Sequence, residues 1–176
     1  MNKPNGRKRC ILDIEATDNV WHGRLICIGI MDTETKEMRI FSDENEESLL
    51  VQFLQFFEEN KYTELIGYNI NFDIRFVLAK CMKYRLSATA FYRAFCTDLM
   101  MILKSFRKGY DFNEVGTLDQ WGRFLLGQGK LATEVSIPML YKMGRVDEII
   151  EYCENDLRLT FGVWERLHAV IGDVYS

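Results

Sequence analysis

Apolar and polar residues alternate along the chain in a way that predicts an α/β domain. Three short apolar runs come first, and the polar turn "DTETKE" between the second and the third favours an antiparallel meander. These runs cover residues 9–16, 24–31 and 37–42. Over 43–60 the spacing changes to the period of a helix, with leucine and phenylalanine side chains on one wide apolar face.

The two periodicities continue to alternate through the rest of the chain. We expect further strands at 64–69 and 89–97, and helices at 72–84, 117–127 and 146–170. A helix capped by Thr97 or Asp98 and a short helix over "MLYKMG" complete the pattern. This order of elements predicts an α/β fold with a central mixed five-stranded sheet flanked by helices. No repeat, linker or low-complexity segment is visible, so we expect one domain over 9–172 after a basic tail, 1–8.

The first strand, in "CILDIEATDN", carries two carboxylates in a run that otherwise suits a core. Side chains on a strand alternate between faces, so Asp13 and Glu15 point the same way while their neighbours point the other. Two like charges on one face of an apolar strand repel each other and resist leaving water. The pair therefore predicts a compensating partner elsewhere in the fold.

Two more acids occupy positions that face an apolar interior. On the helical wheel of 146–170, Asp156 lies at the edge of the apolar stripe, one turn after Tyr152. Asp73 lies at the start of the helix over 72–84, just after a buried strand. Each acid has an ordinary alternative. A buried arginine could pair with Asp156, and the helix dipole favours a first-turn acid such as Asp73.

Together the four acids indicate a metal site. Carboxylate oxygens without a histidine or cysteine cluster suit Mg²⁺ or Mn²⁺ rather than zinc. Clustered carboxylates that hold two such ions about 3.5–4 Å apart are an established arrangement for phosphodiester cleavage. We therefore expect two divalent cations to compensate the charges of Asp13 and Glu15.

Three short motifs occur in an order that resembles the DEDD superfamily of 3′–5′ exonucleases. "DIEATD" resembles the first motif, D-x-E, and "YNINFDIRFV" resembles the second, in which an aromatic residue and Asp follow an Asn. "YCENDLRLT" resembles the tyrosine form of the third motif, Y-x-x-x-D, which is typical of the DEDDy branch of this DnaQ-like group. Over residues 9–168 the chain is similar to polymerase-B-like proofreading exonuclease domains, and the resemblance implies a ribonuclease H-like fold.

The resemblance also implies a role for each acid. Asp13 would bridge both ions, and Asp73 would act on the second one. Glu15 and Asp156 would hold the ion that activates water. Tyr152 would orient the attacking water through its hydroxyl, although an aromatic packing role stays open. The activity implied is hydrolysis of single-stranded DNA or RNA from the 3′ end, with release of nucleoside 5′-monophosphates.

The chain departs from the family where the first strand ends. Many members have two threonines after the Glu of the first motif, whereas here Ala16 replaces the first and Thr17 remains to contact substrate. In the second motif, Asn69 is either a substrate contact or a turn residue. Val20 or Trp21 could stack on the terminal base, or could belong to the core.

A basic loop offers a path for a nucleic-acid strand. Lys104, Arg107 and Lys108 precede the aromatic residues Tyr110 and Phe112. Basic residues mixed with aromatic ones suit contact with a phosphate backbone and with stacked bases. Solvated surface charge is the ordinary alternative, both for this loop and for the basic tail.

Composition limits the class of protein without deciding its function. The formal net charge is −4, which bound cations would offset. Five scattered cysteines, with neither a signal peptide nor a long apolar run, favour a cytoplasmic protein without a membrane segment. The expected partners are single-stranded DNA or RNA 3′ ends, with a polymerase or repair protein in trans as a further candidate. Two alternatives stay open: a catalytically inactive module that binds nucleic acid or protein, and an endonuclease on the same fold, which Y-x-x-x-D disfavours.

Overall fold

The computed structural model describes residues 6–105, 116–132 and 135–172. Its strands are β1 (Arg9–Ala16), β2 (Leu25–Asp32), β3 (Met38–Ser42), β4 (Glu64–Gly67) and β5 (Phe95–Asp98). They form one sheet in the order β3-β2-β1-β4-β5. β1, β2 and β3 make the antiparallel meander, and β4 and β5 extend the sheet from β1 in parallel. The prediction of an α/β fold with a mixed five-stranded sheet is confirmed.

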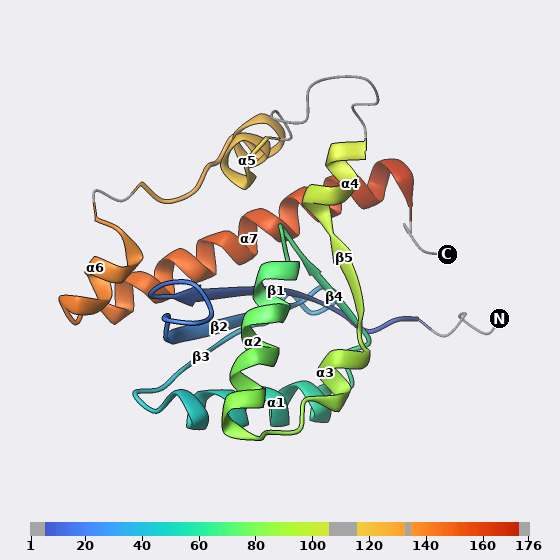
Figure 1. Cartoon of the computed structure of the whole chain (residues 1–176). Helices are drawn as coiled ribbons and strands as arrows, with labels where there is room; N and C mark the ends of the chain where they lie inside the picture. The colour runs from blue at the N-terminus through green and yellow to red at the C-terminus, as the bar shows by residue number, and fades with distance from the viewer. Residues whose placement is uncertain (1–5, 106–115, 133–134, 173–176) are drawn as a thin grey trace.

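Helices cover both faces of this sheet. They are α1 (Glu46–Asn60), α2 (Asn71–Tyr84), α3 (Thr89–Arg93), α4 (Leu99–Ser105), α5 (Leu118–Leu126), α6 (Ile137–Lys142) and α7 (Val146–Ile171). The long helix α7 runs across one face, and α1, α2 and α3 cover the other (Figure 1). α5 and α6 pack against α7.

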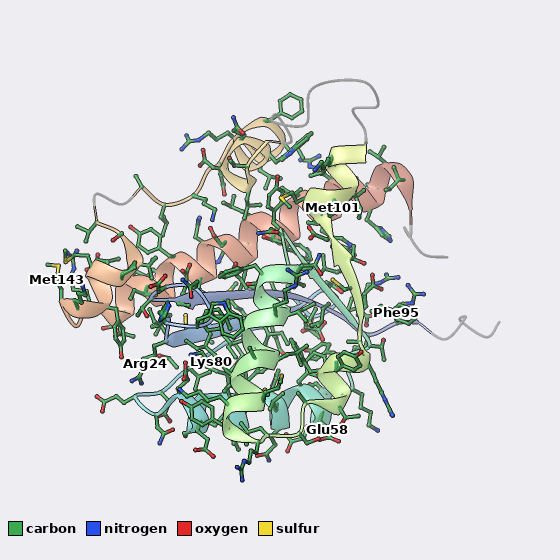
Figure 2. The ribbon with its side chains drawn as sticks, in the orientation of Figure 1. Arg24, Glu58, Lys80, Phe95, Met101 and Met143 are labelled. Carbon is green, nitrogen blue, oxygen red and sulfur yellow. The ribbon has the colours of Figure 1, made fainter. Side chains whose placement is uncertain are left out.

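The parallel strands bring acidic residues to one edge of the sheet. Phe95, labelled in Figure 2, marks the opposite edge, where β1, β4 and β5 begin. Asp13 and Glu15 lie near the end of β1, and Asp98 ends β5. Asp73 follows β4, in the first turn of α2. Because the carboxyl ends of parallel strands meet at the same edge, the topology gathers these acids in one region.

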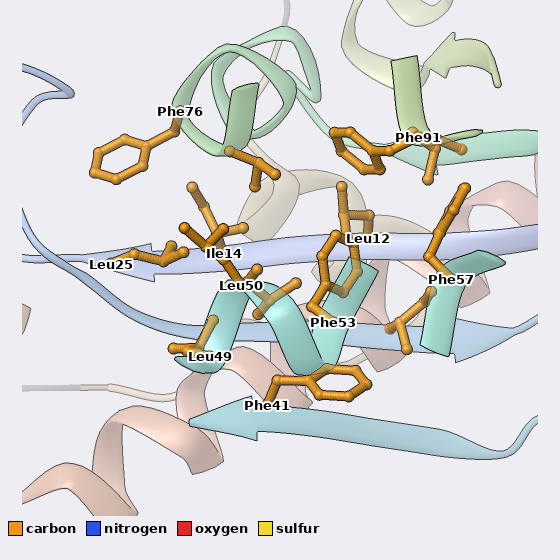
Figure 3. Close-up of a cluster of buried hydrophobic side chains, with 14 of the residues drawn as sticks. Leu12, Ile14, Leu25, Phe41, Leu49, Leu50, Phe53, Phe57, Phe76 and Phe91 are labelled. Carbon is orange, nitrogen blue, oxygen red and sulfur yellow. The ribbon is translucent and has the colours of Figure 1, made fainter. Parts of the chain in front are cut away.

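The alternation of β1 decides which side chains meet which layer. Leu12 and Ile14 point into the core that the sheet forms with α1, α2 and α3 (Figure 3). Ile11 points the other way, into the core that includes α7. Asp13 and Glu15 share the face of Ile11 because side chains on a strand repeat every two residues. Both acids therefore project towards α7, as the sequence pattern predicted for their common face.

Several helix ends follow local signals in the sequence. Thr117 begins α5 with a capping box, and Gly127 ends it with a left-handed φ of 68°. Asp98 caps α4 by accepting the N–H of Met100 at 3.0 Å. The other predicted cap, Thr97, instead donates its hydroxyl to Glu64 at 2.6 Å.

The strand predicted at 89–97 is wrong in its first half. Residues Thr89–Arg93 form α3, and only the second half of the segment forms β5. The aromatic residues there favour a strand locally, but Phe91 packs edge-on against Phe53 and Phe57, with ring centroids 5.5 and 5.4 Å apart. The helical turn brings Phe91 into that core, so tertiary packing overrides the local preference.

Two predictions about composition can be compared with the fold. Cys10, Cys27, Cys81 and Cys153 are buried, as expected for small apolar side chains. Within the described ranges, no helix is long and apolar enough to cross a membrane.

Candidate metal centre

Three carboxylates meet between β1 and α7. Asp13 and Glu15 project from β1, and Asp156 projects from the buried side of α7. One oxygen of each carboxylate lies within 4.8 Å of the others, a spacing at which all three can hold one metal ion. Asp156 is only 7% exposed, whereas Asp13 and Glu15 are half-buried.

A glycine lets α7 approach the sheet closely enough for this meeting. Gly29 of β2 lies directly opposite Asp13 in the strand register. A Cβ at Gly29 would lie 2.6 Å from Cys153 Sγ and 2.7 Å from Leu157 Cδ1, both on α7. A larger residue would therefore force these side chains, or α7 itself, to move in this packed core.

The charge of the three acids is incompletely balanced. Oδ2 of Asp13 is shielded from solvent, and no group in the described part of the chain hydrogen-bonds to it. Burial, and then the neighbouring acids, raise the pKa of Asp13 well above its usual range. Burial and the charge of Asp156 raise the pKa of Glu15 to about 7. Burial also raises the pKa of Asp156, although the charge of Lys130 opposes this.

Asp73 lies beside this group but outside its compact set of ligand atoms. Its Oδ1 accepts the N–H of Ile14, which lies between Asp13 and Glu15 in β1, at 3.0 Å. Burial raises the pKa of Asp73 to about 8, against the opposing effect of backbone hydrogen bonds. The four predicted acids thus converge, three of them as a compact group and Asp73 alongside.

This donor set fits a hard divalent cation. It consists of carboxylate oxygens, and within the described residues it includes a buried oxygen that no hydrogen-bond donor reaches. A cation would supply the missing compensation, and oxygen atoms are the ligands that Mg²⁺ and Mn²⁺ prefer. The structure therefore supports an acidic metal site built on Asp13, Glu15 and Asp156.

Sequence reasoning missed Lys130, which lies between α5 and α6. Its ammonium pairs with Oδ2 of Asp156. Burial lowers the pKa of Lys130, but attraction to Asp156 and to the other acids outweighs this effect and raises the pKa overall. The sequence around it, "GQGKLAT", has no periodicity that points inward, so nothing local marks this lysine as part of a site.

Tyr152 lies one turn before Asp156 on α7. Its hydroxyl donates to the carbonyl oxygen of Ala132 at 3.1 Å. Its ring packs against the core that includes α7. The side chain is therefore anchored at both ends, with its hydroxyl next to the segment that carries Lys130.

The loop after β1 is closed by backbone and side-chain contacts. Oγ1 of Thr17 accepts the N–H of Arg24, and the N–H of Thr17 donates to the carbonyl of Arg24, both at 2.9 Å. The side chain of Asn19 accepts the N–H of Trp21 within the loop. Val20 packs against the core, whereas Trp21 is 83% exposed. Of the two residues predicted for base stacking, Trp21 is the one available at the surface.

The other predicted substrate contacts are more scattered. Asn69 has a left-handed φ of 61°, and its N–H donates to Asp98 at 3.0 Å, so its backbone belongs to the turn before α2. Lys104 lies in the last turn of α4. Arg107 and Lys108 lie outside the described residues, as do the aromatic residues of their loop.

Two described residues of the basic tail lie at the far edge of the sheet. Arg7 lies over the ring of Phe95, 4.2 Å from its centroid, and pairs with Glu64. Lys8 pairs with Asp32 at 3.7 Å. These contacts fasten the tail where β1 begins, at the opposite end of that strand from Asp13 and Glu15.

Comparison with known proteins identifies the family and the fold. Residues 21–176 match the model of a family described as "Predicted 3'-5' exonuclease related to the exonuclease domain of PolB", a range that begins after Asp13 and Glu15 and includes the other three predicted catalytic residues. Among solved structures, the chain is similar to the family B DNA polymerase from the hyperthermophilic archaeon Pyrobaculum calidifontis, with a TM-score of 0.75 and 14% identity. The match covers 95% of this chain and 25% of the polymerase chain, and at this identity it shows the fold alone. No protein with a curated description matches the chain.

The predicted ribonuclease H-like fold and the resemblance to polymerase-B-like exonuclease domains are thereby confirmed.

Proposed function

The chain belongs to the family of predicted 3′–5′ exonucleases related to the exonuclease domain of PolB, and from this premise we propose that it degrades single-stranded DNA or RNA from the 3′ end. The reaction is hydrolysis of the terminal phosphodiester with release of nucleoside 5′-monophosphates. It uses two divalent ions, Mg²⁺ or Mn²⁺. The observation that carries the proposal is the compact group of Asp13, Glu15 and Asp156 with Asp73 beside it.

The acids divide the binding of the ions between them. Bound ions would supply water activation and stabilisation of the charge that develops on the phosphate oxygens. The charges of Asp73, Glu15 and Asp156 all act on Asp13, which supports a role for Asp13 as a ligand of both ions. Glu15 and Asp156 would hold the ion that activates water, and Asp73 would act on the second ion.

Tyr152 and Lys130 supply polar groups next to the acids. Tyr152 lies one turn before Asp156 on α7, and its hydroxyl, which donates to the carbonyl of Ala132, would orient the attacking water. The ammonium of Lys130 lies beside Asp156, where it would donate to a phosphodiester bound at the site and offset its negative charge.

The surface beside the site suits an unpaired strand. Trp21 presents an exposed ring on the loop that follows the metal-binding strand, and an aromatic ring there can stack on any base. Thr17, Asn69 and the basic loop that begins with Lys104 are the further candidates for substrate contact. The chain spans about a quarter of the length of the similar polymerase. A polymerase or repair protein that acts in trans is a further candidate partner.

A second function is favoured by the pairing of Lys130 with Asp156. A cation of the chain beside the acids reduces their repulsion without any bound ion, which suits a catalytically inactive module that binds nucleic acid or protein. Binding of Mn²⁺ distinguishes the two functions, because an ion that binds only the folded protein raises its stability.

The proposal is tested by parallel digestion of 5′-labelled single-stranded DNA and RNA with Mg²⁺ or Mn²⁺. We expect shortening from the 3′ end, no product with EDTA, and an intact circular single strand. Asp156→Asn is the matched control, because it keeps the size of the side chain and removes its charge. Cleavage of the circle would indicate an endonuclease. Failure to digest either strand, together with no stabilisation by Mn²⁺, would favour the binding module.

A further inference from the structure

Residues 127–132, which we call the strap, follow α5 and contact two polar side chains of α7, Asp156 and Tyr152. The ammonium of Lys130 pairs with Asp156, and the carbonyl of Ala132 accepts the hydroxyl of Tyr152 at 3.1 Å. The position of one short segment therefore decides what two of the proposed catalytic residues contact.

The strap runs back along α5 to the first turn of that helix. It begins at Gly127, whose left-handed conformation reverses the chain. There Asp119 accepts the N–H of Lys130 through Oδ1 at 2.8 Å and Nε of Arg123 through Oδ2 at 2.8 Å. Both oxygens of Asp119 are thus engaged, one by the strap and one by the next turn of the helix.

Gly129 lets the strap lie directly on this carboxylate. A Cβ at Gly129 would lie 2.4 Å from Oδ1 of Asp119 and 2.7 Å from Cζ and Nε of Arg123. Leu118 of α5 and Leu159 of α7 are buried in the same core, which keeps α5 in place on α7. Asp119 therefore holds the strap through a carboxylate that is 33% exposed and that also pairs with Arg123.

We propose that Asp119 is a positioning residue of the site. By holding the strap, it keeps the ammonium of Lys130 against Asp156 and the carbonyl of Ala132 on the Tyr152 hydroxyl. A lysine side chain is long and flexible, so a fixed backbone is needed to confine its ammonium to one carboxylate. The consequence for catalysis rests on the proposed exonuclease function, whereas the consequence for metal binding does not.

Two substitutions at Asp119 separate the hydrogen bond from the charge. Asp119→Ala removes the acceptor of the Lys130 N–H, and Asp119→Asn retains an oxygen that can accept it. We expect D119A to lower kcat by about 10-fold or more with KM changed by less than about threefold, because a misplacement of about 1 Å can cost on the order of 100-fold in rate. D119N should retain most of the wild-type kcat. Arg123→Met leaves the hydrogen bond between Asp119 and Lys130 in place, and it is the matched control.

The affinity for Mn²⁺ gives a readout that does not depend on activity. The Lys130 ammonium competes with a metal ion for Asp156, so release of the strap frees that carboxylate. We expect Mn²⁺ binding, measured by titration with electron paramagnetic resonance, to tighten by about two- to fivefold in D119A and in Lys130→Met. D119N and R123M should bind Mn²⁺ like the wild type.

Two results would overturn the positioning role: a D119N protein as slow as D119A, or unchanged Mn²⁺ affinity in both D119A and Lys130→Met. If the wild type degrades neither DNA nor RNA while the Mn²⁺ affinities follow the expected order, the proposed function fails and the positioning role stands. Circular dichroism checks that each variant folds. Gly129→Ala displaces the strap from the same carboxylate, and it replaces D119A if that protein does not fold.

Discussion

The protein buries charge in two places, and the two places differ in how the charge is balanced. In the first, Glu46 of α1 and Lys80 of α2 are 7% and 5% exposed, and their charged atoms lie 3.2 Å apart. The Lys80 ammonium, labelled in Figure 2, also donates to the carbonyl of Gly23 at 2.5 Å. Glu46 accepts the N–H of Leu25 at 2.7 Å and the hydroxyl of Tyr84 at 2.6 Å. Each buried charge there has several partners.

The second place is the acidic group between β1 and α7. Three carboxylates face one another there, and among the described residues the cation paired with them is Lys130, on Asp156. Oδ2 of Asp13 accepts no hydrogen bond from any described residue. Charge is therefore in excess at this site, in contrast to the pair between α1 and α2.

The pKa of the buried carboxylate is shifted in opposite directions in the two places. Burial would raise the pKa of Glu46, but the hydrogen bonds from Tyr84 and Leu25 and the charge of Lys80 lower it below its usual value. Burial raises the pKa of Asp13, and the neighbouring acids raise it further. Both carboxylates lose hydration on burial, so their interaction partners decide whether the pKa is raised or lowered. A buried charge with its partners contributes to the fold, whereas one without them is available to a ligand.

The largest expected difference is the effect on activity of neutralising one acid in each place. Asp13→Asn should lower the rate of degradation by about 10³-fold or more, because it removes the proposed bridging ligand. It should not lower the melting temperature, since it relieves repulsion. Glu46→Gln is the control, and should lower the melting temperature with little change in rate per folded molecule. Degradation of 5′-labelled strands measures the rate, and thermal melts measure the melting temperature of each variant. An Asp13→Asn protein that melts well below the wild type would contradict the comparison.

The next effect is on stability, after removal of the cation in each place. Lys80→Met should reduce the free energy of unfolding by about 3 kcal/mol, because Glu46 then loses its buried counter-charge and keeps only the exposed Lys83, at 3.3 Å. Lys130→Met should reduce it by about 1 kcal/mol or less, since the Lys130 side chain is 46% exposed. Urea unfolding of both variants provides the measurement. An equal loss of unfolding free energy in the two variants would mean that the buried acids depend equally on their lysine partner in both places.

Added metal should stabilise only through the acidic group. Mn²⁺ at 100 times its dissociation constant is expected to raise the free energy of unfolding by about 2.7 kcal/mol. In Lys80→Met, Mn²⁺ should raise the free energy of unfolding by the same amount, from a lower value without metal. In Asp13→Asn, most of this increase should be lost. Thermal melts with increasing Mn²⁺ test this prediction. A full gain in the Asp13→Asn protein would place the ion elsewhere.

The smallest expected effect is a slope of stability with pH in metal-free buffer. The folded pKa values of Glu15 and Asp73 are raised to about 7 and about 8, above the value of about 4 in an unfolded chain. Their contribution to stability is therefore fully present below about pH 4 and is lost as the pH rises through 7 and 8.

We expect the free energy of unfolding to fall as the pH rises from about 5 to about 8.5, because the acids of the unfolded chain are charged throughout this range. A Glu15→Gln, Asp73→Asn double variant should flatten this slope. Glu46, whose pKa is lowered, contributes across that whole range and loses its contribution only in more acidic solution. A slope that persists in the double variant would assign it to other groups.

The fold was predicted best where a signal is local. The alternation of β1 gave bounds of 9–16 that agree with Arg9–Ala16, and the helix expected at 117–127 agrees with α5, which Thr117 caps and Gly127 ends. The strand expected at 89–97 failed because Phe91 reaches its partners only through contacts distant in sequence. A local preference cannot include that packing energy.

The candidate site divides in the same way. Asp13, Glu15 and Asp156 could be found because each interrupts an apolar pattern. Lys130 and Asp119 could not, because Lys130 lies in a polar loop and Asp119 in the first turn of a helix, two places where such a charged residue is ordinary. Both residues matter because the strap joins them to the site. The sequence shows that the chain reverses at Gly127, but it does not show which residues the strap then contacts.

The sequence by itself determined that two acids share one face of a core strand and that two more point inwards from helices. Burying like charges is unfavourable, so the pattern alone predicted that they would be brought together with cations. Only the tertiary structure decided how closely they meet, because that depends on the approach of α7 over Gly29. It also decided that the cation of the chain at the site is Lys130 and that its anchor is Asp119. These contacts join residues from separate elements, and only packing sets the distances between them.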